Sequence, residues 1–90
     1  MVTTSLLNLK LERLLPEVQR MAVVSLPSDV MEISLEPDLN ILHVRFRKPV
    51  KAELGEPLHL KIHLFRERKS GKIVAVDILD TDEMLLSARR

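Results

Sequence analysis

Residues 30–47 read VMEISLEPDLNILHVRFR. Apolar and polar side chains alternate along both halves of this stretch, and the segment PDLN between the halves is typical of a turn. The pattern predicts a β-hairpin in which Glu36 pairs with Ile41. That register gives each face of the hairpin a consistent character. It sets Leu35 against Leu42, Ile33 against Val44 and Met31 against Phe46 on the apolar face, and Glu32 against Arg45 on the polar face.

Residues 58–78 repeat the alternation and predict a second hairpin. Its loop is Lys69-Ser70-Gly71, where the glycine supplies the left-handed conformation that a three-residue hairpin loop requires. The register then sets Leu64 against Val76 and His63 against Asp77. The apolar positions of this hairpin are Leu58, Leu60, Ile62, Leu64, Val74, Val76 and Ile78. Residues 48–57 carry two prolines and a glycine, so we expect them to be the loop between the hairpins.

Residues 4–24 carry apolar side chains at helical spacing, which predicts an amphipathic helix. Pro16 has no amide proton and clashes inside a regular helix, so we expect a kink or a break near Leu15. Residues 21–26, MAVVSL, fit a strand equally well, and the sequence leaves both alternatives open. We favour the helix, with Pro27-Ser28-Asp29 ending it.

The C-terminal segment begins with Asp80-Thr81-Asp82-Glu83. Asp80 followed three residues later by Glu83 matches a capping box, which predicts a short helix. Together the elements predict one α+β domain over residues 1–90. Its expected parts are a helical segment (1–27), a four-stranded antiparallel sheet made of two hairpins (30–79) and a C-terminal helical tail (80–90).

The composition excludes several kinds of site. The 90 residues contain no Cys, Trp or Tyr and only two Phe. Thiolate chemistry, disulfides and cysteine-ligated metals are therefore excluded. The chain also lacks the aromatic platforms on which single-stranded nucleic acids stack. Fourteen basic and thirteen acidic residues give a net charge of +1, so no global field attracts a polyanion.

The sequence also bears on location and source. No apolar run reaches the length of a membrane span, and residues 1–5 lack the basic region of a signal peptide. We therefore expect a soluble, cytoplasmic protein that does not contact a membrane. One Gln, two Asn, no Cys and 30% charged residues are typical of a thermophilic source.

Two stretches, ISLEPDLNILHVR (33–45) and SGKIVAVDILD (70–80), resemble domain-of-unknown-function family 2283. These are small prokaryotic proteins whose first hairpin has an acidic turn followed by Leu-Tyr-Ile and whose last strand follows a glycine turn. The resemblance covers residues 31–80, with Leu35 and His43 where the family tends to carry Tyr. It implies a prokaryotic source, no catalytic residues, and a role as the antitoxin-like partner of a small toxin.

Three histidines, His43, His59 and His63, fall on the predicted polar face of the sheet. His59 and His63 are separated by four residues of extended chain, about 13 Å, which is too far for one metal ion. Cross-strand charge pairing explains the positions of the carboxylates near these histidines as well as a catalytic role would. No nucleophile or phosphate-loop motif accompanies them. We therefore expect no catalytic residue, no cofactor and no metal, and an unrecognised enzyme or small-molecule binder stays open as an alternative.

The polar strand positions form a candidate basic face. Its five main residues are His43, Arg45, Arg47, Lys61 and His63, with His59 beside them and Arg66, Arg68, Lys69 and Lys72 at the hairpin tip. Such a face favours nucleic-acid phosphates. Glu32, Glu67 and Asp77 are expected to neutralise much of its charge, so weak nucleic-acid binding is an alternative rather than the preferred function.

A surplus of apolar residues points to an interaction surface. One small core cannot shelter all of them, and those left over are Leu6, Leu9, Val23, Val24, Leu85 and Leu86. Large exposed apolar patches usually mark interfaces, and two-fold dimers are the commonest way to bury them. The sequence therefore predicts a non-catalytic protein-interaction module that forms a homodimer, with a further protein partner competing for the same surface.

Overall fold

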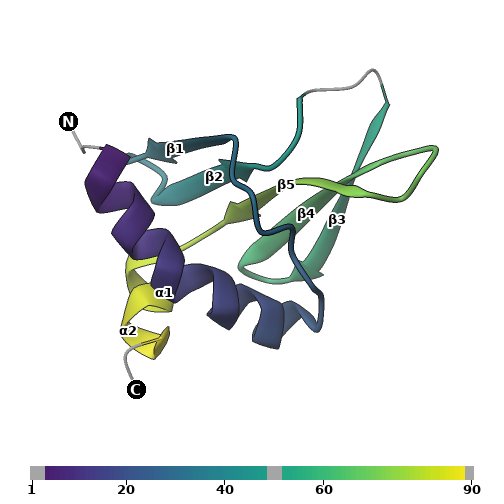
Figure 1. The fold of residues 1–90 in the computed structure, drawn as a ribbon. Coiled ribbons are helices and arrows are strands. Elements are labelled where there is room, and N and C mark those ends of the chain that lie inside the picture. Colours follow the sequence, from purple (N-terminus) through teal and green to yellow (C-terminus); the bar gives the residue numbers. More distant parts are fainter. Residues whose placement is uncertain (1–3, 49–51, 89–90) are drawn as a thin grey trace.

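The structure, a computed structural model, describes residues 4–48 and 52–88 of the chain, with side chains from 11 to 84 within those ranges. It is an α+β fold with an antiparallel sheet, as predicted (Figure 1). The elements are α1 (Thr4–Ala22), β1 (Glu32–Glu36), β2 (Ile41–Arg45), β3 (Glu53–His59), β4 (Ile62–Glu67), β5 (Ile73–Ile78) and α2 (Thr81–Ala88).

The strands form one sheet in the order β1-β2-β5-β4-β3, and every neighbouring pair is antiparallel. The register of the first hairpin is confirmed, and that of the second is confirmed from His63 to Phe65. A shift between Phe65 and Arg66 then sets Arg66 against Ile73, and Glu67 N–H donates to Lys72 O, so the loop is 68–71 rather than the predicted 69–71. In the first hairpin Leu35 pairs with Leu42 and Glu32 with Arg45, and β4 and β5 pair Leu64 with Val76. Gly71 has a φ of 73° in the loop before β5, as predicted. Met31, by contrast, lies outside β1 and is exposed, although Phe46 is buried.

The prediction of four strands was wrong, because residues 48–57 are not all loop. Most of β3 lies there, and a tight turn at Leu60-Lys61 divides the predicted strand 58–64. Leu60 is consequently 91% exposed, whereas Leu64 is fully buried. Alternation with a period of two continues across this turn without a glycine or asparagine to mark it, so the sequence pattern hides it. Pro57 is tolerated because β3 is an edge strand.

The helix α1 lies across one face of the sheet and closes the core (Figure 1). It continues through Pro16 without a break, but its axis changes direction near the middle, as expected for proline. Its residues Leu11, Leu14 and Val18 are buried. They pack in one cluster with Leu42, Val44, Phe46, Ile62, Leu64, Ile73, Val76, Ile78 and Met84. In the last turns, a hydrogen bond from Arg20 lowers the pKa of Glu17 and raises the pKa of Arg20.

The end of α1 decides between helix and strand for residues 21–26. The helix ends at Ala22, and the segment that follows is irregular. Val23 adopts a left-handed conformation with a φ of 53°, and Val24 N–H donates to Gln19 O at 3.2 Å. This is the Schellman arrangement, whose left-handed position is usually glycine. A β-branched residue there is strained, and the Val23 side chain is 89% exposed.

Replacing Val23 by glycine is therefore expected to stabilise the protein by about 1 kcal/mol, because the strain disappears and little contact is lost. For a domain of this size, that gain corresponds to a rise in Tm of about 4–8 °C in thermal unfolding followed by circular dichroism. The matched control is Val24→Gly, which should lower Tm because Val24 packs against the core. An unchanged or lower Tm for Val23→Gly would contradict the left-handed helix end.

The helix α2 is anchored by Thr81, which is buried. Its hydroxyl donates to Asn40 O at 3.1 Å and to Ile78 O at 3.2 Å, so it ties the helix start to the β1–β2 turn. Asp80 stands at the N-cap as predicted, because its carbonyl accepts the first helical bond from Met84 N–H at 3.1 Å, but its φ is 50° and its side chain does not form the predicted capping box with Glu83. The carboxylates of Asp80 and Glu83 instead lie against the Lys61 ammonium. Lys61 is distant in the sequence, so the local sequence pattern could not predict this contact.

Candidate functional site

The outer face of the sheet, opposite α1, carries a row of polar residues on four neighbouring strands. Their order across the sheet is Ser34, His43, Asp77 and His63, each paired with the next in the strand register. His43 Nδ1 is hydrogen-bonded to Asp77 Oδ1, and both side chains are partly exposed. The register predicted from the sequence brings His63 to Asp77, and the pairing of β2 with β5, which was not predicted, adds His43 on the other side of the same carboxylate.

This row has the residue types of a serine-nucleophile triad but not its geometry. Nucleophilic catalysis requires the hydroxyl to be hydrogen-bonded to the imidazole. Among the described residues, no hydrogen bond joins Ser34 to His43, and no group of three or more His, Asp or Glu side chains could hold a metal ion. The His43–Asp77 bond therefore acts between strands, as a cross-strand pair that stabilises the sheet.

His59 is not part of this row. A β-bulge lies between Pro57 and His59, and it sets His59 against Ile62 rather than on the face of His43. Its Nδ1 accepts a hydrogen bond from Lys61 N–H at 3.2 Å, within the turn between β3 and β4. The prediction that all three histidines share the polar face was wrong, because one extra residue in a strand reverses the faces of those that follow.

Arg45 and Glu53 form an ion pair across the outer face. Two bonds join the guanidinium to the carboxylate, at 3.1 and 3.2 Å, and the side chains are only 15% and 17% exposed. The pair connects β2 to β3, which β5 and β4 separate in the sheet. In the row between them, Ala75 is fully buried. Phe65 lies next to it, so close to β3 that a Cβ on Gly55 would stand 3.3 Å from the ring.

The candidate basic face does not come together as one patch. His43 is paired with Asp77, and Arg45 with Glu53. Lys61 lies at the opposite end of the sheet from Arg45, beside the carboxylates of Asp80 and of Glu83 in α2. His63 is the cross-strand neighbour of Asp77, and Arg47 follows β2 and lines a pocket near the β4–β5 hairpin. Carboxylates therefore offset three of the five predicted residues.

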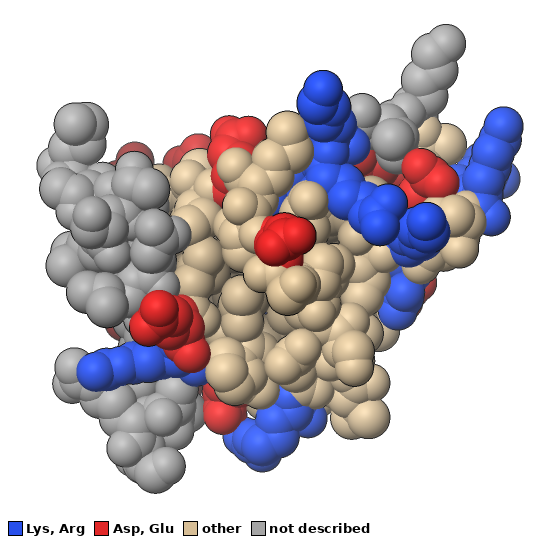
Figure 2. Space-filling model, in the orientation of Figure 1, with Lys and Arg blue, Asp and Glu red and all other residues tan. Residues whose placement is uncertain are grey.

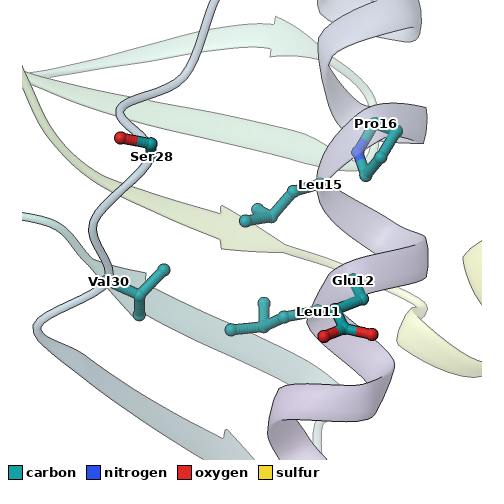
Figure 3. Close-up of a pocket in the computed structure, with 6 residues that line it drawn as sticks. All are labelled: Leu11, Glu12, Leu15, Pro16, Ser28 and Val30. Carbon is teal, nitrogen blue, oxygen red and sulfur yellow. The ribbon is translucent and has the colours of Figure 1, made fainter.

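The predicted interaction surface can be placed only in part. Val23 is exposed and Val24 packs against the core. Leu6, Leu9, Leu85 and Leu86 belong to the helices, but their side chains lie outside the described residues. A groove of about 440 Å³ runs between α1 and residues 28–30, with Leu11 and Leu15 facing Val30 (Figure 3). Its polar side chains are those of Glu12 and Ser28. Two polar side chains provide few hydrogen bonds with which to orient a small molecule.

Three exposed leucines at the β3 edge were missed by the sequence analysis. Leu54 is 50% exposed, Leu58 37% and Leu60 91%, and all three lie on β3 or in its turn to β4. We refer to them as the edge leucines. Leu58 and Leu60 were assigned to the core because they continue the alternation of the buried strand. The signal that could have identified them is Gly55 and Pro57, which are typical of an edge strand.

The backbone of β3 is available for pairing on its outer side. Arg68 N–H donates to Ala52 O at 2.9 Å. This bond shows that the backbone groups of Ala52 point toward β4, and so sets the alternation for the rest of β3. By alternation, Leu54 and Glu56 bond to β4, while Gly55 and Pro57 point away from it. The other edge, β1, is short and begins and ends with exposed glutamates, features that discourage pairing. The β3 edge is longer and carries the edge leucines, although Pro57 and the β-bulge after it limit pairing near its end.

Comparison with models of protein families, with curated proteins and with solved structures finds no match to the chain. The resemblance to domain-of-unknown-function family 2283 is thus carried by residues 33–45 and 70–80 alone. Within residues 4–48 and 52–88, neither helix has the length and apolar character needed to cross a membrane.

Proposed function

We propose that the protein is a non-catalytic interaction module that forms a homodimer by pairing β3 of one copy with β3 of another. The observation that carries this proposal is the exposure of the edge leucines beside an open strand edge. Exposed apolar side chains next to unpaired backbone groups favour the addition of a further strand. A second copy supplies both the strand and the matching leucines.

An antiparallel pair of β3 strands has a register that suits this sequence. If the two-fold axis passes through Glu56, Leu54 of one copy lies opposite Leu58 of the other, on both sides of the axis. Gly55 N–H of each copy then donates to Pro57 O of the partner, while the reciprocal bond to Gly55 O is absent because proline has no N–H. The two Glu56 carboxylates approach each other, and Arg66 offsets their repulsion because its Nε lies 3.2 Å from Glu56 Oε1.

The same edge would serve a protein partner. An extended segment of a small toxin, the partner implied by the family resemblance, could add to β3 in place of the second copy. The antitoxin-like role and homodimerisation are therefore alternative uses of one surface. A partner that binds there should convert the dimer into a complex with one copy of each chain.

Sedimentation equilibrium at micromolar concentration tests the proposal. The wild-type protein should have about twice the 10.3 kDa mass of the chain. Leu54→Lys combined with Leu58→Lys should raise the Kd of the dimer by about tenfold or more, because the lysines face each other across the two-fold axis. The control, Leu39→Lys, changes an exposed leucine in the β1–β2 turn and should leave the dimer intact.

Two results would refute the β3 interface. One is a wild-type protein that stays a monomer throughout the concentration range. The other is a dimer that the two lysines do not weaken, which would move the interface to the helices. Thermal unfolding of the lysine variant checks that it is folded, since both positions are exposed and their substitution should leave the core intact.

A further inference from the structure

A pocket of about 400 Å³ opens where the loop after α1 meets the end of the β4–β5 hairpin. The loop contributes Ser25 and Leu26, and the sheet contributes Arg47, Arg66 and Lys72. Three cationic side chains from three segments thus line one cavity. Figure 2 shows Lys and Arg side chains gathered at this end of the molecule, over the β4–β5 hairpin.

Contacts within the fold hold the Arg66 side chain and the backbone of Lys72. Arg66 Nη1 donates to Gly71 O at 3.0 Å and its Nε lies 3.2 Å from Glu56 Oε1, which leaves its other donors for a ligand. Lys72 is set by the hairpin loop, because its N–H donates to Ser70 Oγ at 3.2 Å and its carbonyl accepts from Glu67 N–H at 2.8 Å. These contacts fix the backbone beside the pocket before any ligand arrives.

The charge of this pocket is not balanced by its own lining. The residues that line it include no Asp or Glu, and Glu56 engages one face of Arg66 from outside the lining. On the rest of the sheet the situation is different, since Arg45 and Lys61 each have carboxylate partners. A cavity with several cations and no carboxylate concentrates positive potential and attracts an anion.

We propose that this pocket binds the phosphate group of a small anionic ligand. Arginine presents a planar set of donors that matches phosphate oxygens, and lysine adds a compact charge. The lining holds no aromatic side chain on which a nucleobase could stack, so recognition rests on the phosphate and not on a base. The pocket shares Arg66 with the proposed β3 interface, because Arg66 also pairs with Glu56, whereas Arg47 and Lys72 lie outside that edge.

Isothermal titration calorimetry with inorganic pyrophosphate at low ionic strength tests this proposal. We expect saturable binding with one site per chain. Arg47→Gln combined with Lys72→Gln should weaken binding by about tenfold or more, because two of the three cations are removed. The matched control is Lys69→Gln in the same hairpin loop, which removes one exposed charge that does not line the pocket and should change the affinity less than threefold. Arg66 is left intact because it also holds the loop.

Several outcomes would overturn the proposal. Absence of pyrophosphate binding is one, and equal losses in the pocket variant and the Lys69 control would be another, since they would indicate only net charge. A third is a single-stranded RNA that binds more tightly than pyrophosphate and is weakened equally by all three substitutions, which would indicate an extended phosphate-tracking surface instead. All the changed side chains are exposed, so unfolding midpoints close to wild type are expected and are to be measured alongside.

Discussion

The Leu64→Ala variant is expected to lose about 2–5 kcal/mol of unfolding free energy. Leu64 is fully buried in β4, between the neighbouring strands β5 and β3 and within the cluster that α1 closes. Truncation removes its apolar contacts and leaves a cavity that the sheet cannot collapse to fill. Since small domains have only about 5–15 kcal/mol of stability in total, the variant should be close to unfolding.

Leu60→Ala is the matched control for this experiment. Leu60 is four residues away in the same hairpin and carries the same side chain, but it is exposed in the turn before β4. We expect its unfolding free energy in urea to lie within about 0.5 kcal/mol of wild type. Equal losses for the two variants would show that residues 58–64 form one continuous strand, as the sequence alone suggested, and that the turn at Leu60-Lys61 is absent.

Removing one partner of the Arg45–Glu53 pair is expected to cost about 1–3 kcal/mol. Breaking an exposed ion pair usually costs less than about 1 kcal/mol of unfolding free energy, and breaking a fully buried pair costs about 3–5 kcal/mol. The expected loss lies between these values. The reason is that the two side chains are mostly shielded from water but keep some contact with it. The substitutions are Arg45→Met and Glu53→Gln, which keep much of the side-chain volume while removing the charge.

A double-mutant cycle measures this interaction. We expect the double variant to be less destabilised than the sum of the single variants, with a coupling of about 1 kcal/mol or more. The control cycle uses Lys61 and Glu83, where the carboxylate is largely exposed and the coupling should be smaller. Additive losses at Arg45 and Glu53 would mean that β2 and β3 do not meet across the outer face in solution.

The sequence by itself determined the pairing within the hairpins. Side chains on a strand alternate between faces, so one register of residues 32–45 places Ile33, Leu35, Leu42 and Val44 on one side. The same reasoning paired His63 with Asp77 and Leu64 with Val76. Gly71 also allowed the turn before β5 to be predicted from the sequence, because its left-handed backbone conformation is strained for other residues. These features depend on chain neighbours or on strands a short loop apart.

The tertiary structure decided the position of β3 in the sheet and the contacts that follow from it. The path between β2 and β3 places β3 at the far edge, and this position alone makes Leu54 and Leu58 exposed. The same path brings Glu53 to Arg45, which no strand pairing predicts.

The candidate sites follow the same division. The sequence placed Arg47, Arg66 and Lys72 in one broad basic patch, but their convergence on one pocket requires the loop after α1 to meet the β4–β5 hairpin. Alternation reports which face a side chain occupies and carries no information on which strand lies beside it. Strand order, edges and pockets are set by packing energies summed over the whole chain, and so they emerged only in three dimensions.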